Sequence, residues 1–596
     1  MSDYSAPLAD MRFALAEIAG LREIATLPGC DQAAPDLVDQ VLEEAGKLAH
    51  GVLAPLNVVG DRTHSRLENG VVRTPPGFAE AYKSYVEGGW NSLPFDPEFG
   101  GQGLPQLVAT AVLEMWTAAN LSFSLCPMLT IGTVELLQTH GSEEQKRRYL
   151  AKLISGEWTG TMNLTEPQAG SDVGALRTRA VRSGDHYKIT GQKIFITYGE
   201  HDMAENVVHM VLARLPDAPA GTRGISLFIV PKFLVNPDGG LGARNDFRCV
   251  SLEHKLGINA SPTCVMAYGD AGGAVGYLVG EENRGMECMF TMMNNARLNV
   301  GLQGVAIAER AYQQARDFAK QRVQGKPLGA AGDGALAIVH HGDVRRMLLE
   351  MRSLTEAARA LAYFAAGAVD RARHHPDAAE RAHQQLIADL LTPVVKAWST
   401  DIGVEVASLG VQVHGGMGFI EETGAAQHFR DARITPIYEG TNGIQAIDLV
   451  SRKLRRDEGA AARAFLAEMR RLEQQLLDAG GEDLSVIGEH LTGGFDALED
   501  ATAGIASAIA EDMPGALAGA VPYLELFGIV TGGWLLAKGA LAAHRALGKG
   551  ADKQEFLHAR IMTARFFAEH RLARAPGLVS AVAAGPSVIA FDPELL

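Results

Sequence analysis

The residue best suited to proton transfer is Glu439, in the sequence Arg433–Thr441 (RITPIYEGT). Two isoleucines and a proline make its neighbourhood apolar, and Thr441 is a suitable N-cap for a helix that starts directly afterwards. A carboxylate among apolar groups has its pKa raised toward neutrality, which suits a general base. The same glutamate could instead have a capping role near the start of that helix. The local sequence leaves both roles open.

A second stretch, Met162–Asp172 (MNLTEPQAGSD), gathers hydroxyl groups around a glycine as the chain leaves a predicted strand. Backbone N–H groups and hydroxyls that converge in this way form a nest for a phosphate or for the edge of a flavin. The same residues could equally form an ordinary loop. Further along, Lys193–Thr197 (KIFIT) alternates like a strand and by itself indicates nothing more.

A glycine-rich turn, Gln412–Phe419 (QVHGGMGF), lies between two predicted helices. It does not follow a strand and lacks the GxGxxG spacing, so a dinucleotide-binding fold is not supported. The basic run Arg452–Arg456 (RKLRR) could steer an anionic partner, although such a run is usually a solvated helix face.

Four successive segments must position these motifs. Residues 1–158 read as helices, because stretches such as Pro35–Leu53 place apolar residues on one helical face. Residues 159–284 contain short β-branched runs separated by turn residues, which favours a small antiparallel barrel or sandwich. Residues 285–455 and 456–596 return to helical periodicity. The sequence therefore predicts an α+β chain with an N-terminal helical domain, a central antiparallel β domain, a C-terminal helical bundle and an appended helical domain.

The composition excludes several classes of protein. The chain has 596 residues, of which 47% are hydrophobic and 21% charged, so it can bury a large core and is not predominantly disordered. Its formal net charge of −16 argues against broad nucleic-acid binding. The five cysteines form no CxxC pair, which indicates reduced thiols, as in the cytoplasm, and no metal site is expected.

No membrane attachment is predicted. The first residues lack the basic and apolar regions of a secretory signal. The longest membrane candidate, Leu526–Ala537, is interrupted by glycines and is shorter than the ~20 residues that a spanning helix needs. A buried helix explains it better, and we expect no integral membrane span.

Taken together and in this order, the four motifs resemble those of the acyl-CoA dehydrogenase family over about residues 35–455. Gly88–Trp90 with Glu98–Gly103 (EFGGQG), and Leu278–Met286 (LVGEENRGM), match as well. The additional residues 456–596 make the chain similar to a long bacterial branch of that family. The segments Gly257–Cys264 and His340–Met347 also resemble that branch.

The resemblance implies an FAD enzyme that converts an acyl-CoA thioester to the trans-2-enoyl-CoA. In this family a glutamate removes the α-proton and flavin N5 accepts the β-hydrogen as hydride, and the matching glutamate is Glu439. The thioester carbonyl would be polarised by the backbone N–H of Glu439 and by a flavin ribityl hydroxyl. The implied substrate is either 3-methylmercaptopropionyl-CoA or a fatty acyl-CoA.

The motif matches also imply binding residues. The implied flavin contacts are Met162, Leu164, Thr165, Gly170, Ser171, Phe195, Thr197, Arg322, Gln412, Gly415, Gly416 and Thr441. Arg322 and the Gln412–Gly416 turn would reach the FAD of a neighbouring subunit. The implied substrate contacts are Ser171, Asn294, Arg297 and Gly440. Three features depart from the family pattern: Phe195 replaces the common Trp, Asn294 replaces the usual Asp, and the Phe that usually follows the Arg322 segment is missing.

The implied partners are an electron-transferring flavoprotein as electron acceptor and a second copy of the chain. The resemblance implies a dimer, because in long family members an appended helical domain can occupy the face that short members use to pair dimers into tetramers. An acyl-CoA oxidase that uses oxygen directly remains an alternative, because oxygen reactivity cannot be read from these residues. A flavin-containing scaffold, or a DNA-associated stress protein, with the same fold is a further alternative. The retained Glu439 and the net charge of −16 both disfavour it.

Overall fold

The computed structural model describes residues 4–329 and 334–596. Contacts between residues divide the chain into two compact units. We call Glu44–Leu104 with Met115–Ala296 the β unit. The other segments, Met1–Glu43, Pro105–Glu114 and Arg297–Leu596, make up the helical unit.

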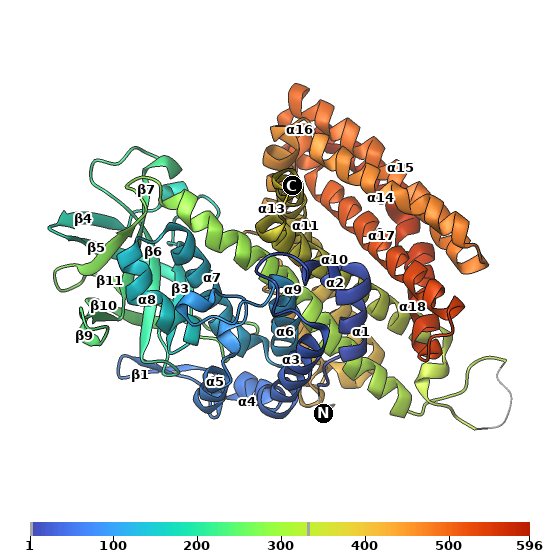
Figure 1. Ribbon diagram of the computed structural model, residues 1–596, viewed down its shortest axis with the longest axis horizontal. Helices are drawn as coiled ribbons and strands as arrows, with labels where there is room; N and C mark the ends of the chain where they lie inside the picture. The colour runs from blue at the N-terminus through green and yellow to red at the C-terminus, as the bar shows by residue number, and fades with distance from the viewer. Residues whose placement is uncertain (1–3, 330–333) are drawn as a thin grey trace. The chain divides into compact units, whose positions relative to one another are not determined.

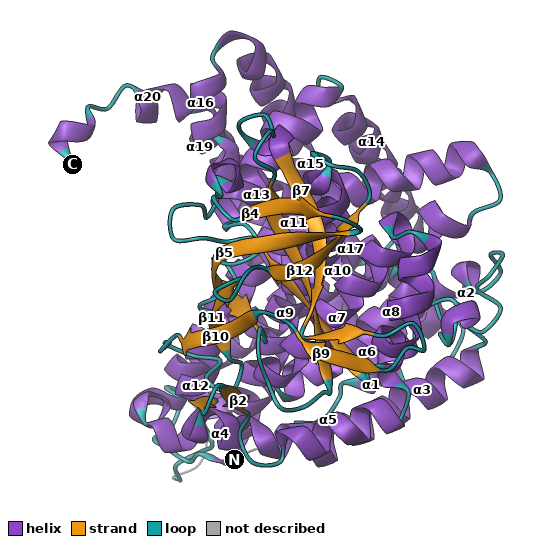
Figure 2. Cartoon of the chain, turned by 90° about the vertical axis from the view of Figure 1, so that its left-hand side faces the viewer, coloured by secondary structure: helices purple, strands orange, loops and turns teal. Residues whose placement is uncertain are grey.

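An eight-stranded sheet forms the centre of the β unit (Figure 2). Its strands are β3 (Trp158–Asn163), β4 (Arg179–Ser183), β5 (His186–Thr197), β6 (Asn206–Arg214), β7 (Ile225–Pro231), β10 (Phe247–Leu252), β11 (Thr263–Tyr268) and β12 (Ala274–Val279). Their hydrogen-bonded order is β10-β11-β5-β12-β7-β6-β3, with β4 beside β5 and β6. Most neighbours are antiparallel, which confirms the predicted β domain, but β3 and β4 each pair with β6 in parallel.

The sheet carries the core of the β unit. Strand β7 is buried at every position and β6 at all but its last, because both lie inside the sheet and have covered faces. Helix α7 (Leu121–His140) packs on β3. The remaining elements of this unit are α4 (Ala54–Thr63), α5 (Phe78–Glu87), α8 (Glu143–Ser155) and the hairpins β1–β2 (Arg66–Glu68, Val71–Arg73) and β8–β9 (Phe233–Val235, Leu241–Arg244).

Long helices build the helical unit. Their bounds are α9 (Gly285–Gln321, in this unit from Arg297), α10 (Gly342–His374), α11 (Ala378–His414), α12 (Ala425–Ala432) and α13 (Asn442–Asp448). The first helices of the chain are α1 (Leu8–Phe13), α2 (Leu21–Ile24), α3 (Pro35–Leu48) and α6 (Gln106–Ala119), the last two only partly in this unit. Helices α9 and α11 approach closely where Gly304 meets Ser399, since a Cβ on Gly304 would lie 2.0 Å from the Ser399 carbonyl oxygen.

The appended residues form a further group of helices in the same unit. These are α14 (Ala460–Ala479), α15 (Glu482–Glu511), α16 (Met513–Ala518), α17 (Ala520–Gly548), α18 (Gln554–His570), α19 (Ala575–Ala583) and α20 (Gly585–Ile589). Figure 1 shows α14, α15 and α17, in orange to red, lying side by side. The four predicted groups of elements are all present, which confirms the predicted fold class.

Helix α17 also packs against α10, α11 and α13. The indole ring of Trp398 on α11 is buried in a notch that two glycines of α17 leave open. A Cβ on Gly528 would lie 2.4 Å from Cγ of Trp398, and one on Gly532 would lie 2.5 Å from its Cη2. Any larger residue at these positions would collide with the ring, so the appended domain is fitted to the helix beneath it.

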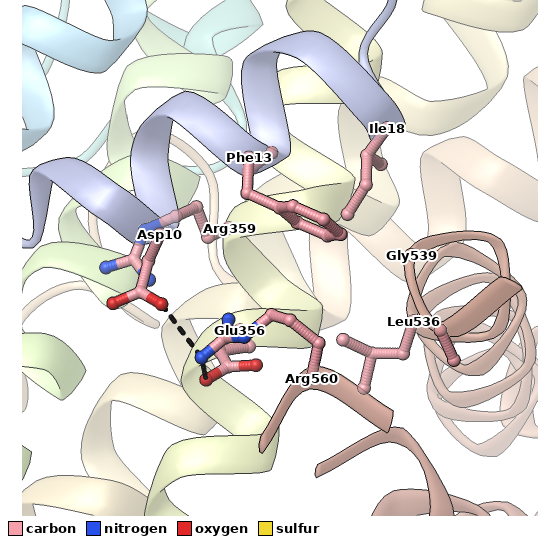
Figure 3. A pocket seen from close by; sticks show the side chains of 10 residues that line it. Asp10, Phe13, Ile18, Glu356, Arg359, Leu536, Gly539 and Arg560 are labelled. Atoms are coloured by element: carbon pink, nitrogen blue, oxygen red, sulfur yellow. Dashed lines mark ion pairs between the residues drawn. The ribbon is translucent and has the colours of Figure 1, made fainter. Parts of the chain in front are cut away.

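An ion-paired arginine joins α18 to helices near the start of the chain (Figure 3). Arg560 Nη2 lies 2.8 Å from Asp10 Oδ1 on α1 and 2.7 Å from Glu356 Oε1 on α10. The three side chains are largely buried, so these pairs are shielded from solvent and direct the docking of α18.

Within the described part of the chain, two helices, α7 and α17, are long and apolar enough to cross a membrane. However, 94% and 89% of their most apolar windows are buried within the fold. They are therefore core helices, as expected for the segment around Leu526–Ala537.

Candidate active site

The loop that carries Glu439 joins α12 to α13 in the helical unit. Glu439 and Gly440 both adopt left-handed backbone conformations, with φ of +56° and +81°. Such a conformation is strained for a glutamate and persists only where the surroundings enforce it. The Gln445 side-chain amide donates to the carbonyls of Glu439 (3.2 Å) and Gly440 (3.1 Å). Thr441 caps α13 by accepting a hydrogen bond from the N–H of Ile444, as predicted.

Two cations influence the carboxylate of Glu439. Burial raises its pKa to about 7, although Arg297 on α9 and Lys396 on α11 favour the charged form and limit the rise. The residue keeps part of its surface accessible, as a group that meets a substrate must. A carboxylate with a pKa near neutrality can both hold and release a proton at physiological pH, as a general base must.

Arg297 belongs to a row of charges that runs inward from the exposed Arg452. Its Nη1 lies 3.3 Å from Oδ2 of Asp448 on α13, and both side chains are about 95% buried. Asp448 also accepts a hydrogen bond from Nε of Arg452 at 2.5 Å. The row Arg452–Asp448–Arg297 therefore ends beside Glu439. Arg297 is not a solvated charge, and Arg452, from the basic run, pairs with this row.

In the β unit, the Met162–Asp172 stretch is held by a buried ion pair. Nζ of Lys193 donates to Glu166 Oε1 at 2.8 Å and to the carbonyl of Leu164 at 2.9 Å. Glu166 also accepts from the hydroxyl of Thr178 at 2.6 Å and from the N–H of Arg177 at 2.6 Å. Burial alone would raise the pKa of Glu166, but Lys193 and these hydrogen bonds outweigh it and lower the pKa to about 2. The stretch is thus a loop that a buried ion pair holds in place.

Strand β5 presents an unusual aromatic residue beside this loop. The N–H of Ile194 donates to the carbonyl of Thr165 at 2.9 Å, which joins the strand to the loop. The neighbouring Phe195 is 59% exposed and has a left-handed φ of +60°. Two residues further along β5, Thr197 lies opposite Thr263 of β11. The exposed and strained phenylalanine offers an aromatic face that a flat apolar ligand could cover.

The other predicted flavin residues lie at the ends of two long helices of the helical unit. Arg322 follows α9 and is exposed, and Gln412 is in the last turn of α11. The rings of Phe318 and His414 stack with centroids 4.4 Å apart, so the two helix ends lie together. Gly415 and Gly416 directly follow α11, and a Cβ on either would meet nothing within 4 Å.

Each unit, taken by itself, offers groups that suit part of a flavin dinucleotide. Phe195 offers an exposed aromatic face, Thr165 and Ser171 offer hydroxyls on the fixed loop, and a Cβ on Gly170 would meet nothing within 4 Å. Arg322 offers an exposed cation for a phosphate. The predicted residues of the β unit are Met162, Leu164, Thr165, Gly170, Ser171, Phe195, Thr197 and Asn294. Those of the helical unit are Arg297, Arg322, Gln412, Gly415, Gly416, Glu439, Gly440 and Thr441.

Sequence reasoning missed several residues that hold these loops. Glu166 and Lys193 were part of the motifs but were given no role. Lys396, Asn442 and Asp448 carried no motif at all. The signal for Lys396 is a single charge inside the apolar helical run TPVVKAW, because such a residue must find a buried partner.

Four sequence profiles of one family match the chain in order. The acyl-CoA dehydrogenase N-terminal domain matches residues 61–157, the middle domain 161–271 and the C-terminal domain 283–454. A fourth profile, described as acetyl-CoA dehydrogenase C-terminal like, matches residues 463–592.

The chain belongs to the acyl-CoA dehydrogenase family.

Individual relatives agree with this assignment. The chain is 50% identical over 570 residues to 3-methylmercaptopropionyl-CoA dehydrogenase of Ruegeria pomeroyi, with 96% of both chains covered. It is 35% identical over 602 residues to a broad-specificity linear acyl-CoA dehydrogenase of Mycobacterium tuberculosis, again with 96% of both covered. As an acyl-CoA dehydrogenase, the protein is an oxidoreductase that acts on acyl-CoA thioesters.

Solved structures share the fold. Caenorhabditis elegans ACDH-11, in complex with C11-CoA, matches with a TM-score of 0.75 at 20% identity, covering 100% of this chain and 97% of that one. The acyl-CoA dehydrogenase of Bacillus anthracis, complexed with FAD, matches with a TM-score of 0.74 at 20% identity, covering 96% and 91%. The fold of the dehydrogenase, including the appended helices, is therefore found in other members of known structure.

Proposed function

We propose that this dehydrogenase oxidises 3-methylmercaptopropionyl-CoA to its trans-2-enoyl thioester and that Glu439 is the general base. The observation that carries the role of Glu439 is its environment. The glutamate is fixed in a strained loop, and its pKa is raised to about 7 while two cations lie near it. No other glutamate in the predicted motifs has this combination.

The reaction removes a proton from the α-carbon and a hydride from the β-carbon. The Glu439 carboxylate takes the α-proton and becomes neutral as negative charge moves onto the thioester carbonyl. The left-handed backbone at Glu439 and Gly440 holds the carboxylate for this transfer. FAD, held by the residues that the motifs imply, would supply the acceptor for the β-hydrogen and its two electrons. The flavin and substrate contacts remain those implied by the motifs, including Asn294, Arg297, Ser171 and Gly440 for the substrate.

The choice of substrate rests on the 50% identity to the Ruegeria pomeroyi enzyme over nearly the whole of both chains. Flavin bleaching under anaerobic conditions tests it, with butyryl- to stearoyl-CoA compared against the methylthio-propionyl thioester. We expect the thioether substrate to bleach the flavin fastest. Faster bleaching by a linear acyl-CoA would instead assign the enzyme to fatty acyl-CoA oxidation, as the Mycobacterium tuberculosis relative suggests.

The E439Q variant tests the base in the same assay. General base catalysis contributes about 10²–10⁴-fold to such rates, so we expect a loss of that size with FAD still bound. Bleaching at the wild-type rate would remove Glu439 from the mechanism. Rapid release of peroxide when the reduced enzyme meets air would replace the dehydrogenase with an oxidase.

We further propose a homodimer, with electron-transferring flavoprotein as the electron acceptor. The support for a dimer is apolar surface at the ends of α9 and α11. Its exposed side chains are Val323, Leu328, Met417, Phe419 and Ile420. A second copy that covered them would also bring Arg322 and Gln412 to a neighbouring FAD. Sedimentation tests this, and a tetramer would contradict it.

The domain limits that accompany this proposal are 1–158, 159–284, 285–455 and 456–596, and the proposed location is the cytoplasm. Limited proteolysis should cut near these limits before it cuts within them.

A further inference from the structure

A buried ammonium group lies beside the loop of Glu439. Lys396 is in the middle of α11, and its side chain is fully buried. Its Nζ donates a hydrogen bond of 2.8 Å to Oδ1 of Asn442. This partner is a neutral amide, although burying an ammonium group without a carboxylate in contact is costly. The lysine therefore occupies a position that its hydrogen bond alone does not explain.

Asn442 connects this lysine to the loop. It is the first residue of α13, three positions after Glu439, and its backbone N–H donates to the carbonyl of Pro436 at 2.9 Å. Its Nδ2 lies within 2.8–3.0 Å of Oδ1 of Asp401, Oγ1 of Thr400 and the carbonyl of Ala397, all on α11. The loop is thus tied to α11 at one residue, and Lys396 completes that tie.

The charges that face this group come from several helices. Lys396 interacts electrostatically with Glu439, with Asp401 on its own helix and with Arg297 on α9. Asp401 in turn interacts with Glu525 on α17 and with Arg433, and it has a pKa raised to about 6 by burial. Burial lowers the pKa of Lys396 to about 7, while Glu439 and Asp401 oppose that change.

Arg297 acts on the pKa of Glu439 more strongly than Lys396 does, but it is also paired with Asp448. Lys396 has no carboxylate within ion-pair distance among the described residues, so its charge is available to Glu439. Removing Arg297 would also leave Asp448 without this partner, whereas removing Lys396 breaks no ion pair. The loss of Lys396 should therefore act mainly on the pKa of Glu439.

We propose that Lys396 is a positioning residue for the dehydrogenation: it ties the Glu439 loop to α11 through Asn442, and its positive charge sets the pH at which Glu439 is ready to accept a proton. This proposal rests on the proposed role of Glu439 as the base. Where Lys396 is protonated, which its lowered pKa of about 7 confines to neutral and lower pH, its positive charge stabilises the carboxylate in the resting enzyme. When the carboxylate takes the α-proton, that stabilisation is lost. The lysine therefore makes Glu439 a weaker base, but it increases the fraction of enzyme in which Glu439 is ionised and able to accept a proton.

The test compares K396M and K396R with wild-type holoenzyme. The first readout is the pH at which the rate of flavin reduction by acyl-CoA is half-maximal. We expect K396M to raise this pH by about one unit or more, since an opposite charge nearby shifts a carboxyl pKa by that amount. Below the midpoint the rate should fall about tenfold per unit. K396R should restore the wild-type profile.

The second readout does not depend on turnover. Infrared difference spectra follow the carboxyl C=O band of Glu439, which is assigned by its loss in E439Q. Its titration midpoint should rise in K396M and return in K396R. If none of the acyl-CoA thioesters reduced the flavin of the wild-type enzyme, the proposed function would fail. The infrared titration would still measure the coupling between Lys396 and Glu439 in that case.

Lys538 provides a matched control. It is a largely buried lysine of the helical unit whose Nζ donates to the carbonyl of Ile18 at 2.8 Å, and Glu439 is not among the groups that shift its pKa. K538M should lower stability without moving either midpoint. If K396M does not fold, K396Q removes the charge while keeping an amide that can reach Asn442. An unchanged midpoint in the folded variant, whatever its stability, would overturn the proposal.

Discussion

Arg297 on α9 and Asp448 on α13 form a buried ion pair, with Nη1 and Oδ2 3.3 Å apart. The pair joins the long central helix to the short helix that follows the Glu439 loop. Breaking a buried pair by removing one partner is costly, because the other charge stays in a poorly hydrated place.

We expect R297M to lower the free energy of unfolding by about 3 kcal/mol, the lower end for a broken buried pair, because Arg452 still faces Asp448. R297M should also raise the pKa of Glu439, since one of its two cations is lost. Denaturant titration measures the first effect. The double variant R297M/D448N should lose less than the two single variants combined, and strict additivity would show that the pair is not coupled.

The raised pKa of Glu439 makes stability depend on pH. Between about pH 4.5 and 7 the unfolded chain has already lost the proton that the folded protein keeps, so stability falls as pH rises through this window. E439Q has no such titration. We therefore expect the free energy of unfolding of E439Q, relative to that of wild type, to increase from pH 4.5 to pH 7 by at most about 3 kcal/mol. Above pH 7 this difference should stay constant. A constant difference between pH 4.5 and pH 7 as well would mean that Glu439 has an ordinary pKa.

The buried Glu166–Lys193 pair supports the predicted flavin loop. E166Q leaves the Lys193 ammonium buried without its counter-charge, so we expect a loss of about 3 kcal/mol of stability and faster release of FAD. In wild type, the ionised Glu166 stabilises the fold fully above about pH 4.5, and this stabilisation disappears as pH falls toward 2, because folding lowers the pKa of Glu166. The E166Q variant lacks it at every pH. Thermal unfolding and flavin fluorescence measure the two effects. E166Q/K193M should recover stability, and if it does not, the pair is not the reason for the loss.

Alanine at Gly528 tests the fit of the appended domain. Its Cβ would lie 2.4 Å from Cγ of Trp398, so we expect G528A to cost about 1–3 kcal/mol by overpacking. Catalysis should fall as well, since Trp398 is two residues from Lys396. Gly504 on α15 is the control, because a Cβ there meets nothing within 4 Å and G504A should be neutral or stabilising by up to about 1 kcal/mol. Equal losses in both variants would contradict a specific fit.

Local patterns were sufficient to predict much of this fold. The helix predicted from residue 285 is α9 (Gly285–Gln321), and the helix predicted over Pro35–Leu53 continues through a π turn at Ala49–Leu53 into α4. Strand pairing was not predictable in the same way. Each strand shows its own alternation but not its neighbour, so the parallel pairing of β3 with β6 became visible only in three dimensions.

The same division applies to the candidate site. Glu439 could be singled out because its apolar surroundings are local in sequence. Lys396 precedes it by more than forty residues and Arg297 by more than one hundred, so their approach depends on how α9 and α11 pack. The close contact at Gly304 that sets this packing has no sequence signature beyond a glycine in a helix.

The ion pair between Asp10 and Arg560 has a consequence for biosynthesis. At roughly 5–20 residues per second, the roughly 550 residues between them take about 30–110 s to emerge from a ribosome. Helix α1 is therefore made long before α18, and α11 is complete before α17 can cover Trp398. During that interval the nascent bundle presents an unfilled apolar seam to chaperones and to other nascent chains. Helix α17, which packs on α13 directly after the Glu439 loop, is made only near the end of translation, so the yield of folded dehydrogenase should depend on how well the waiting chain is protected.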